Sequence, residues 1–100
     1  MPIQRIVCFK FKEGTSDEAI QQHMDDFAAM KTEIPQIIAY RGGHTKPGDN
    51  NRPPDFDVMH YLTYASMEDI DVYLPHPAHR RFIERNCGIW DHVMVLNSEY

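Results

Sequence analysis

The first stretch of the sequence alternates apolar and polar positions with a period of two. Over residues 2–12, Ile3 and Val7 fall on one side of this alternation, and Ile6 and Cys8 fall on the other side. Successive side chains of a strand point to opposite faces of its sheet. The pattern therefore predicts a strand with apolar groups on both faces.

Similar alternation predicts three more strands along the chain. They are expected over residues 37–45, 56–64 and 89–98. Gly42 and Gly43 interrupt the first of these three, and glycines inside a strand often mark a β-bulge. We therefore expect a bulge at that position.

A helical spacing of apolar residues separates the first two strands. It predicts an amphipathic helix over residues 15–33, with Phe27 on its apolar stripe and His23 one turn earlier on the same side. Thr15 and Glu18 match a capping box, in which two side chains satisfy the first free backbone amides. We expect the helix to begin there.

The region between the last two strands reads as a helix broken by prolines. Ser66 opens a short helix by the same capping logic, and Pro75 ends it. Pro77 suits the first position of another helix, which Gly88 closes. The resulting order of strand, helix, strand, strand, broken helix and strand predicts a ferredoxin-like α+β sandwich, with helices on one face of a four-stranded antiparallel sheet.

The other face of that sheet is unusually apolar for a surface exposed to water. Ile6, Cys8, Met59 and Tyr61 lie on it if the strand phases are right. Two such sheets packed face to face would bury these residues. We therefore expect a homodimer.

Composition and charge exclude several classes of protein. With 100 residues, 25% of them charged, and a net charge of −5, the chain predicts one acidic domain spanning residues 1–100 without the basic stripe that nucleic acids require. Its first residues lack the continuous apolar run of a signal peptide or membrane span, which predicts a cytoplasmic protein without a membrane partner.

Cys8 and Cys87 show no CxxC spacing and are expected to be reduced thiols.

The phrase YLPHPAHRRF, residues 73–82, is the strongest candidate for chemistry. His79 would stand near the start of a helix, where the helix dipole disfavours the imidazolium ion and favours a neutral ring that can act as a base. Tyr73 would orient a carbonyl or enolate oxygen through its hydroxyl group. A purely structural hydrogen bond is an equally open role for His79, and His76 is interpreted as the residue that begins the helix.

Further side chains would complete a pocket around this pair. Arg5 would supply positive charge for a carboxylate or enolate, and His23 and His60 would add polar groups. Buried histidines more often serve as hydrogen-bonded core residues, so that alternative stays open for both. The expected apolar lining comprises Val7, Phe9, Phe27, Val58, Leu62, Phe82 and Trp90.

The sequence contains no pattern for a metal or cofactor. His76 and His79 are three residues apart but lack a third ligand at suitable helical spacing. No glycine-rich phosphate loop or nucleophile elbow is present. We therefore predict neither a metal nor a cofactor.

Several phrases together resemble the stress-responsive dimeric α/β barrel (Dabb) family, including its olivetolic acid cyclase-like members. They are IVCFKFK near the start, LTYAS, VYLPHPAHRRF, and IWDHVMVLN near the end. The resemblance implies one Dabb domain, a ferredoxin-like protomer, and a dimer whose two sheets form a barrel. It also implies cofactor-free chemistry such as aldol cyclisation, although most family members have no established activity.

The resemblance can be carried onto individual residues. The tyrosine and histidine of the cyclase's Y-x-x-HPAH phrase match Tyr73 and His79, which implies substrate binding and general-base roles for them. Arg5 and Val58 stand where two other pocket histidines would be, and Phe27 stands where a pocket tyrosine would be. His60, on the same strand face as Val58, is a candidate to replace a lost histidine.

These observations lead to one functional hypothesis and two alternatives. The hypothesis is a homodimer that binds a small, apolar, oxygen-bearing molecule and acts on it as a cyclase, isomerase or decarboxylase. The first alternative is a non-catalytic stress or assembly protein whose interior is filled by side chains. The second alternative is a cofactor-free monooxygenase.

Overall fold

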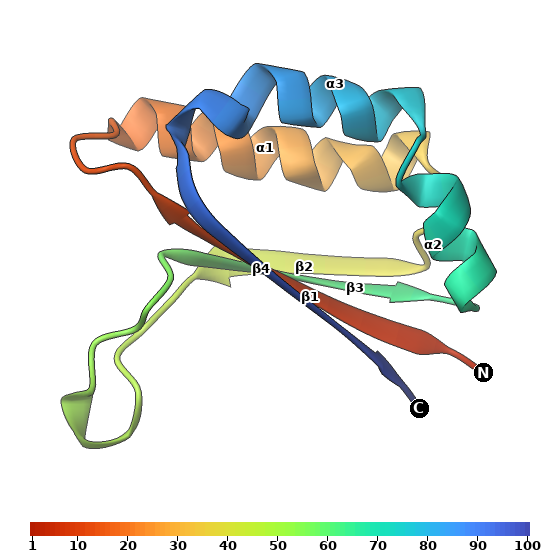
Figure 1. Ribbon diagram of the computed structural model, residues 1–100, viewed down its shortest axis with the longest axis horizontal. Coiled ribbons are helices and arrows are strands. Elements are labelled where there is room, and N and C mark those ends of the chain that lie inside the picture. Colours follow the sequence, from red (N-terminus) through yellow and green to blue (C-terminus); the bar gives the residue numbers. More distant parts are fainter.

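The computed structural model describes residues 1–100, and it has the predicted order of elements (Figure 1). Each predicted strand, and the first helix, lies within two residues of its observed bounds. The elements are β1 (Ile3–Phe11), α1 (Asp17–Glu33), β2 (Ala39–His44), a 3₁₀ turn (Asp49–Asn51), β3 (Val58–Tyr64), α2 (Met67–Tyr73), α3 (Pro77–Asn86), a second 3₁₀ turn (Cys87–Ile89) and β4 (Trp90–Glu99).

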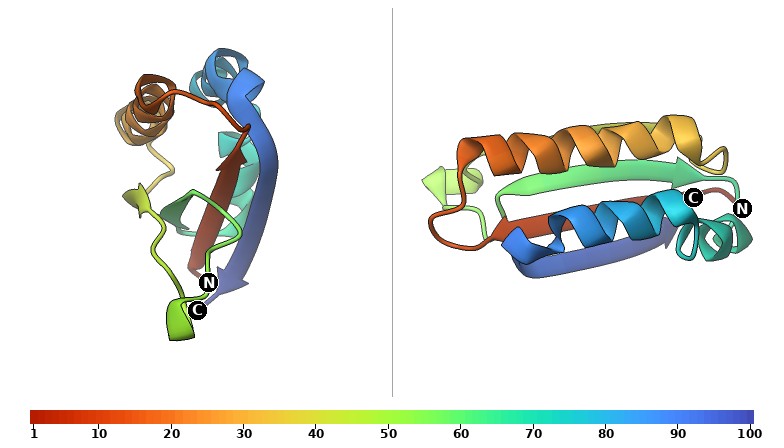
Figure 2. Two further views of the ribbon diagram at one scale, coloured as in Figure 1. Left: turned by 90° about the vertical axis from the view of Figure 1, so that its left-hand side faces the viewer. Right: turned by 90° about the horizontal axis from the view of Figure 1, so that it is seen from above.

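The four strands form one antiparallel sheet in the order β2-β3-β1-β4. Helices α1 and α3 lie side by side over one face of this sheet, and α2 lies at one end, as the two further views in Figure 2 make clear. The ferredoxin-like α+β fold is therefore confirmed. The two chain ends lie together at one end of the paired strands β1 and β4, where the Tyr100 amide donates to the Pro2 carbonyl oxygen at 3.0 Å.

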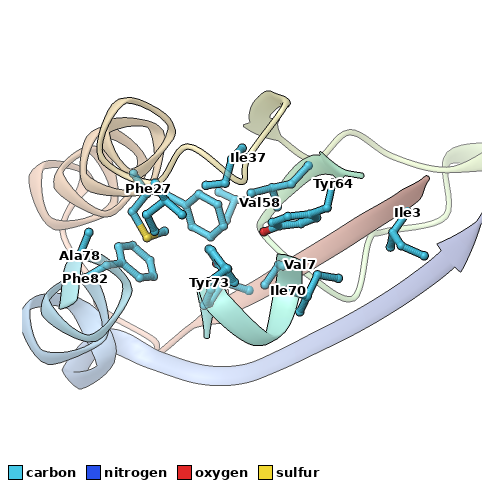
Figure 3. Close-up of a cluster of buried hydrophobic side chains, with 14 of the residues drawn as sticks. Ile3, Val7, Phe27, Ile37, Val58, Tyr64, Ile70, Tyr73, Ala78 and Phe82 are labelled. Carbon is cyan, nitrogen blue, oxygen red and sulfur yellow. The ribbon is translucent and has the colours of Figure 1, made fainter. Parts of the chain in front are cut away.

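The core lies between the helices and the sheet. Ile3, Val7 and Phe9 point from β1 toward the helices, as the period-two pattern predicts, and each is at most 5% exposed. Figure 3 shows Phe27 from α1 and Phe82 from α3 packed into the same cluster as Val7. Burying such side chains is the main favourable term for folding.

The predicted bulge in β2 is absent. Residues from Ala39 to His44 pair with β3 in an unbroken register. Gly42 is required for a different reason, because a Cβ atom there would collide with the hydroxyl group of Tyr40, which lies across the glycine. The glycine therefore makes room for a neighbouring side chain and does not bend the strand.

The first residue of α1 also differs from the prediction. Ser16 is the N-cap, and its Oγ accepts a hydrogen bond from the Ala19 amide at 3.1 Å. The Thr15 hydroxyl instead donates to the Lys12 carbonyl oxygen at 2.6 Å and closes the preceding turn. Adjacent Ser and Thr residues compete for the same cap, and the turn geometry selects Ser16.

No helix covers the second face of the sheet in the single chain. Met59 on this face is 45% exposed and Leu96 is 59% exposed, whereas the smaller Cys8 is covered by its neighbours on the sheet. Burial raises the pKa of the Cys8 thiol, which keeps it protonated. None of the helices has the length and hydropathy needed to cross a membrane.

Candidate functional site

A cavity of about 140 Å³ lies between the helices and strands β1 and β4. It is lined by eight of the residues expected from the sequence, namely Arg5, Val7, Phe9, Phe27, Tyr73, His79, Phe82 and Trp90. Figure 3 shows Phe27, Phe82 and Tyr73 converging from α1, α3 and α2. Tyr73 and His79 thus face one partly open and largely apolar space.

The backbone between α2 and α3 sets the directions of these two side chains. His76 is the N-cap of α3, and its Nδ1 accepts a hydrogen bond from the Ala78 amide at 3.0 Å. Pro77 occupies the first turn, where a missing N–H group costs nothing. The interpretation of His76 as the residue that begins the helix is confirmed.

His79 is held in one tautomer by a backbone contact. Its Nδ1 lies 2.8 Å from the carbonyl oxygen of Leu74, which can only accept, so Nδ1 carries the proton. Burial lowers the pKa of His79, and the positive charge of Arg5 lowers it further. The neutral ring therefore keeps the lone pair of Nε2 free. Burial is the main cause of this lower pKa.

Tyr73 is a phenol donor in the same space. Its ring centroid lies 4.4 Å from that of His79, and the side chain is 1% exposed. Burial raises the pKa of Tyr73 to about 12. The hydroxyl group therefore stays protonated at neutral pH and can donate to a carbonyl or enolate oxygen.

Arg5 brings a buried positive charge to the cavity. It is 7% exposed, its Nη1 donates to Asn97 Oδ1 at 3.1 Å, and its guanidinium carbon lies 5.7 Å from the centre of the Tyr73 ring. Its Nε is buried and has no hydrogen-bond partner. The charge also has no carboxylate partner, because the three ion pairs of the chain involve other residues.

The two other predicted polar residues, His23 and His60, lie outside the cavity lining. Both are fully buried, and their Nε2 atoms are 3.0 Å apart. Trp90 Nε1 donates to His23 Nδ1 at 3.1 Å, and Tyr40 Oη lies 2.8 Å from His60 Nδ1. The structure thus joins these histidines to each other and to two aromatic side chains instead of to the cavity.

Only one arrangement of protons fits this chain of four side chains. The Trp90 indole can only donate, so His23 must accept at Nδ1 and carry its proton on Nε2. His60 then accepts at Nε2 and donates from Nδ1 to the Tyr40 hydroxyl oxygen. Burial is the main cause that lowers the pKa of His23 to about 4 and that of His60 to about 3, so both rings are neutral.

The histidine chain supports two walls of the cavity from outside. His23 holds the indole of Trp90, and His60 stacks on Phe27 with ring centroids 3.7 Å apart and planes 4° from parallel. Val58 is also fully buried outside the lining. His23 and His60 therefore hold two of the lining side chains in place without lining the cavity themselves.

Three residues of the lining were not predicted from the sequence. Ile83, Val93 and Val95 also border the cavity. The two valines pair with Phe9 and Val7 across the β1–β4 ladder, and directly paired residues point to the same face. Pairing β4 antiparallel with β1 in this register would have placed Val93 and Val95 on the cavity side of the sheet.

The other pockets of the protein have fewer side chains suited to catalysis. One of about 450 Å³ lies over Met59 and Tyr61 on the face without helices, and one of about 540 Å³ lies beside the loop near Pro54. Both are broader than the cavity at His79 and lack a buried donor without a partner. No group of three or more His, Cys, Asp or Glu side chains is arranged to hold a metal ion.

Comparisons with known proteins agree with this architecture. The chain is 26% identical over 96 residues to the stress-response A/B barrel domain-containing protein HS1 of Arabidopsis thaliana, covering 96% of this chain and 87% of that one. It superposes on the hydroxynitrile lyase of Passiflora edulis with a TM-score of 0.86 at 19% identity, covering 97% and 91% of the two chains. A dimeric ferredoxin-like protein of unknown function from Thermobifida fusca gives a TM-score of 0.84 at 15% identity, covering 100% and 92%.

The family itself is shown by the sequence over nearly its whole length. The model of the stress responsive A/B barrel domain matches residues 3–100. The match includes both the strands that build the sheet and the phrase that carries Tyr73 and His79. The chain therefore belongs to the stress responsive A/B barrel domain family.

Proposed function

We propose that this protein binds a small, apolar, oxygen-bearing molecule in the cavity at His79 and catalyses proton transfer on it without a cofactor. One observation carries the proposal. His79 has its Nδ1 proton committed to the Leu74 carbonyl oxygen, which leaves Nε2 neutral and free to accept a proton in a side chain that lines a largely apolar cavity. A general base needs this combination of protonation state and position.

The proposed step can be written with its protons balanced. His79 Nε2 takes a proton from a carbon next to a carbonyl group, and the electron pair moves into the carbonyl to form an enolate. Tyr73 and the Arg5 charge stabilise the enolate oxygen. The imidazolium then returns its proton to a different carbon of the same molecule, which completes an isomerisation. In a lyase reaction the electron pair of the enolate instead expels a leaving group from the β-carbon, forming a carbon–carbon double bond, and the imidazolium protonates that leaving group.

The size of the cavity favours small substrates. A cavity of about 150 Å³ is known to accept benzene, so the 140 Å³ space fits a molecule with one ring or a short chain. This supports an isomerase, a decarboxylase or another small-molecule lyase over a cyclase of long polyketides. The Passiflora edulis protein, named a hydroxynitrile lyase, has the same fold.

The proposal also includes a homodimer formed through the face without helices. Exposed Met59 and Leu96 support it, as do dimeric structural neighbours from Thermobifida fusca and Bacteroides fragilis. We expect sedimentation to give twice the mass of one chain at micromolar concentration. A charge in this apolar patch, as in Met59→Asp, should shift the equilibrium toward monomer. A stable monomer in the unmodified protein would exclude the dimer.

The proton-transfer step is testable before the natural substrate is known. Phenylacetone in D₂O provides acidic C–H bonds, and NMR reports their exchange for deuterium. We expect the protein to catalyse this exchange and His79→Ala to lower the rate by about 100-fold to 10,000-fold, the usual range for a positioned base. His44→Ala, at an exposed histidine, is the control. If His79→Ala lowers the melting temperature strongly but exchanges at the same rate, His79 has a structural role only.

A further inference from the structure

Arg5 is the least satisfied charged group in the interior of this protein. Its guanidinium donates from Nη1 to the neutral amide oxygen of Asn97, whereas neither Nε nor Nη2 has a partner in the chain. A buried charge without a counter-ion is costly. Almost all buried polar groups in folded proteins are paired, so each exception calls for a physical reason.

The other buried polar atom without a partner belongs to the same corner. Tyr64 Oη has no hydrogen bond of good geometry and meets only the Tyr73 hydroxyl group, toward which it is a weak donor, and the two ring centroids lie 5.5 Å apart. These two atoms are the only such orphans among the buried side chains. The buried side-chain atoms that lack a good hydrogen bond thus belong to Arg5, which lines the cavity, and to Tyr64, which packs on the lining residue Tyr73.

The charges around the cavity have one sign. Arg5 is positive, whereas burial keeps Tyr73 protonated and His79 neutral. None of the residues that line the cavity is acidic. The side chains around the cavity therefore have one net positive charge. A ligand with a single negative charge would neutralise it.

We propose that the ligand of this cavity is a small monocarboxylate with an apolar body, and that Arg5 binds its carboxylate group. This deepens the proposed function, since it concerns the same cavity. The Nε and Nη2 donors lie on one edge of the guanidinium, and two parallel donors match the two oxygens of a carboxylate. Asn97 occupies Nη1 and orients that edge.

The remaining walls select the body of the ligand. Phe9, Phe27, Phe82 and Trp90 also line the space, with the Phe82 and Trp90 ring centroids 5.6 Å apart. Aromatic walls favour a flat or branched apolar group. A small aryl or short branched-chain acid meets this requirement, with its apolar group in the cavity and its carboxylate at Arg5.

Calorimetry with two matched probes tests the proposal. Phenylacetate and phenylacetamide have nearly the same shape and differ in charge. We expect the unmodified protein to bind phenylacetate at least about tenfold more tightly, since a hydrogen bond to a charged group contributes about that factor or more. Equal affinity for the two probes, or no binding of phenylacetate, would overturn the proposal.

Variants at Arg5 locate the preference. Arg5→Gln should remove the tenfold preference while changing phenylacetamide affinity less than about twofold, and Arg5→Lys should retain part of it because it keeps the charge but loses the paired donors. A preference unchanged in Arg5→Gln would also overturn the proposal. If Arg5→Gln does not fold, Arg5→Lys and the two probes on the unmodified protein still give the answer.

The result is separable from that of the proton-transfer test. His79→Ala should keep the preference for phenylacetate, since binding there depends on Arg5. Carboxylate binding without any deuterium exchange in phenylacetone would uphold the ligand class and remove the proposed catalysis. Deuterium exchange in phenylacetone without any preference for phenylacetate would uphold the proposed catalysis and remove the proposed ligand class.

Discussion

The interior of this protein contains two polar clusters that use the same side-chain types in opposite ways. In the histidine chain, Tyr40, His60, His23 and Trp90 satisfy one another from end to end. In the cavity corner, His79 and Arg5 each have one committed nitrogen and at least one free nitrogen. Complete satisfaction is typical of a structural network, and leftover donors and acceptors are typical of a binding site.

The difference arises from what each cluster can reach. Tyr40 lies across Gly42 to meet His60, and this closes the chain within the protein. At the corner, the backbone oxygen of Leu74 is the only acceptor offered to His79, and it uses Nδ1 alone. One cluster therefore stabilises the fold, whereas the other stays available to a ligand.

Lowering the pH should destabilise the fold by protonating the buried histidines His23 and His60. The pKa values of His23 and His60 in the folded protein, about 4 and about 3, lie below the ordinary value of 6.5. Below pH 6.5 the unfolded chain therefore binds protons that the folded protein does not. Stability should be constant above pH 6.5 and fall toward pH 4 by up to about 2.7 kcal/mol per pH unit. Urea unfolding across this range measures the slope, and a flat profile would show that the rings are not neutral and buried.

Removing one member of the chain should destabilise the fold more than removing His79. His60→Ala deletes a fully buried ring that stacks on Phe27 and leaves His23 without its acceptor. We expect a loss of about 3–5 kcal/mol in the free energy of unfolding, as for other large core side chains. His79→Ala, at a partly exposed ring, should cost less than about 1.5 kcal/mol because only one hydrogen bond is lost. Equal losses would contradict the assignment of the two clusters.

A single methyl group should disturb the outer end of the chain. Gly42→Ala places a Cβ where the Tyr40 hydroxyl lies, so Tyr40 must move away from His60. We expect a loss of about 1–3 kcal/mol, typical of overpacking. Gly43→Ala is the matched control, since a Cβ there meets nothing within 4 Å and should change stability by less than about 0.5 kcal/mol. Similar melting temperatures for both variants would mean that the Tyr40 contact contributes little.

In a cavity wall, the expected loss of stability is no larger than that for Gly42→Ala. Trp90→Phe removes the indole donor to His23 but keeps an aromatic ring beside the cavity. It should cost about 1–3 kcal/mol at most, with deuterium exchange in phenylacetone lowered only a few-fold. A loss of exchange as large as that of His79→Ala would instead make Trp90 part of the chemistry.

Local patterns in the sequence were sufficient for much of the fold. The period-two strands, the helical stripe of α1 and the proline-bounded turn before α3 depend on neighbouring residues, and all three are present. The same local information indicated that Tyr73 and His79 share one region. It did not resolve which of two adjacent residues caps α1, or why Gly42 is a glycine.

The partners of the buried polar groups were decided only by the tertiary structure. His23 meets a ring 37 positions away in His60 and another 67 positions away in Trp90, and Arg5 meets Asn97 across 92 positions. The sequence indicated that these groups are polar residues on buried faces, and it therefore grouped Arg5, His23 and His60 in one pocket. Only the packing of α1 on the sheet separates them, because a hydrogen bond depends on distances of about 3 Å that no spacing along the chain specifies.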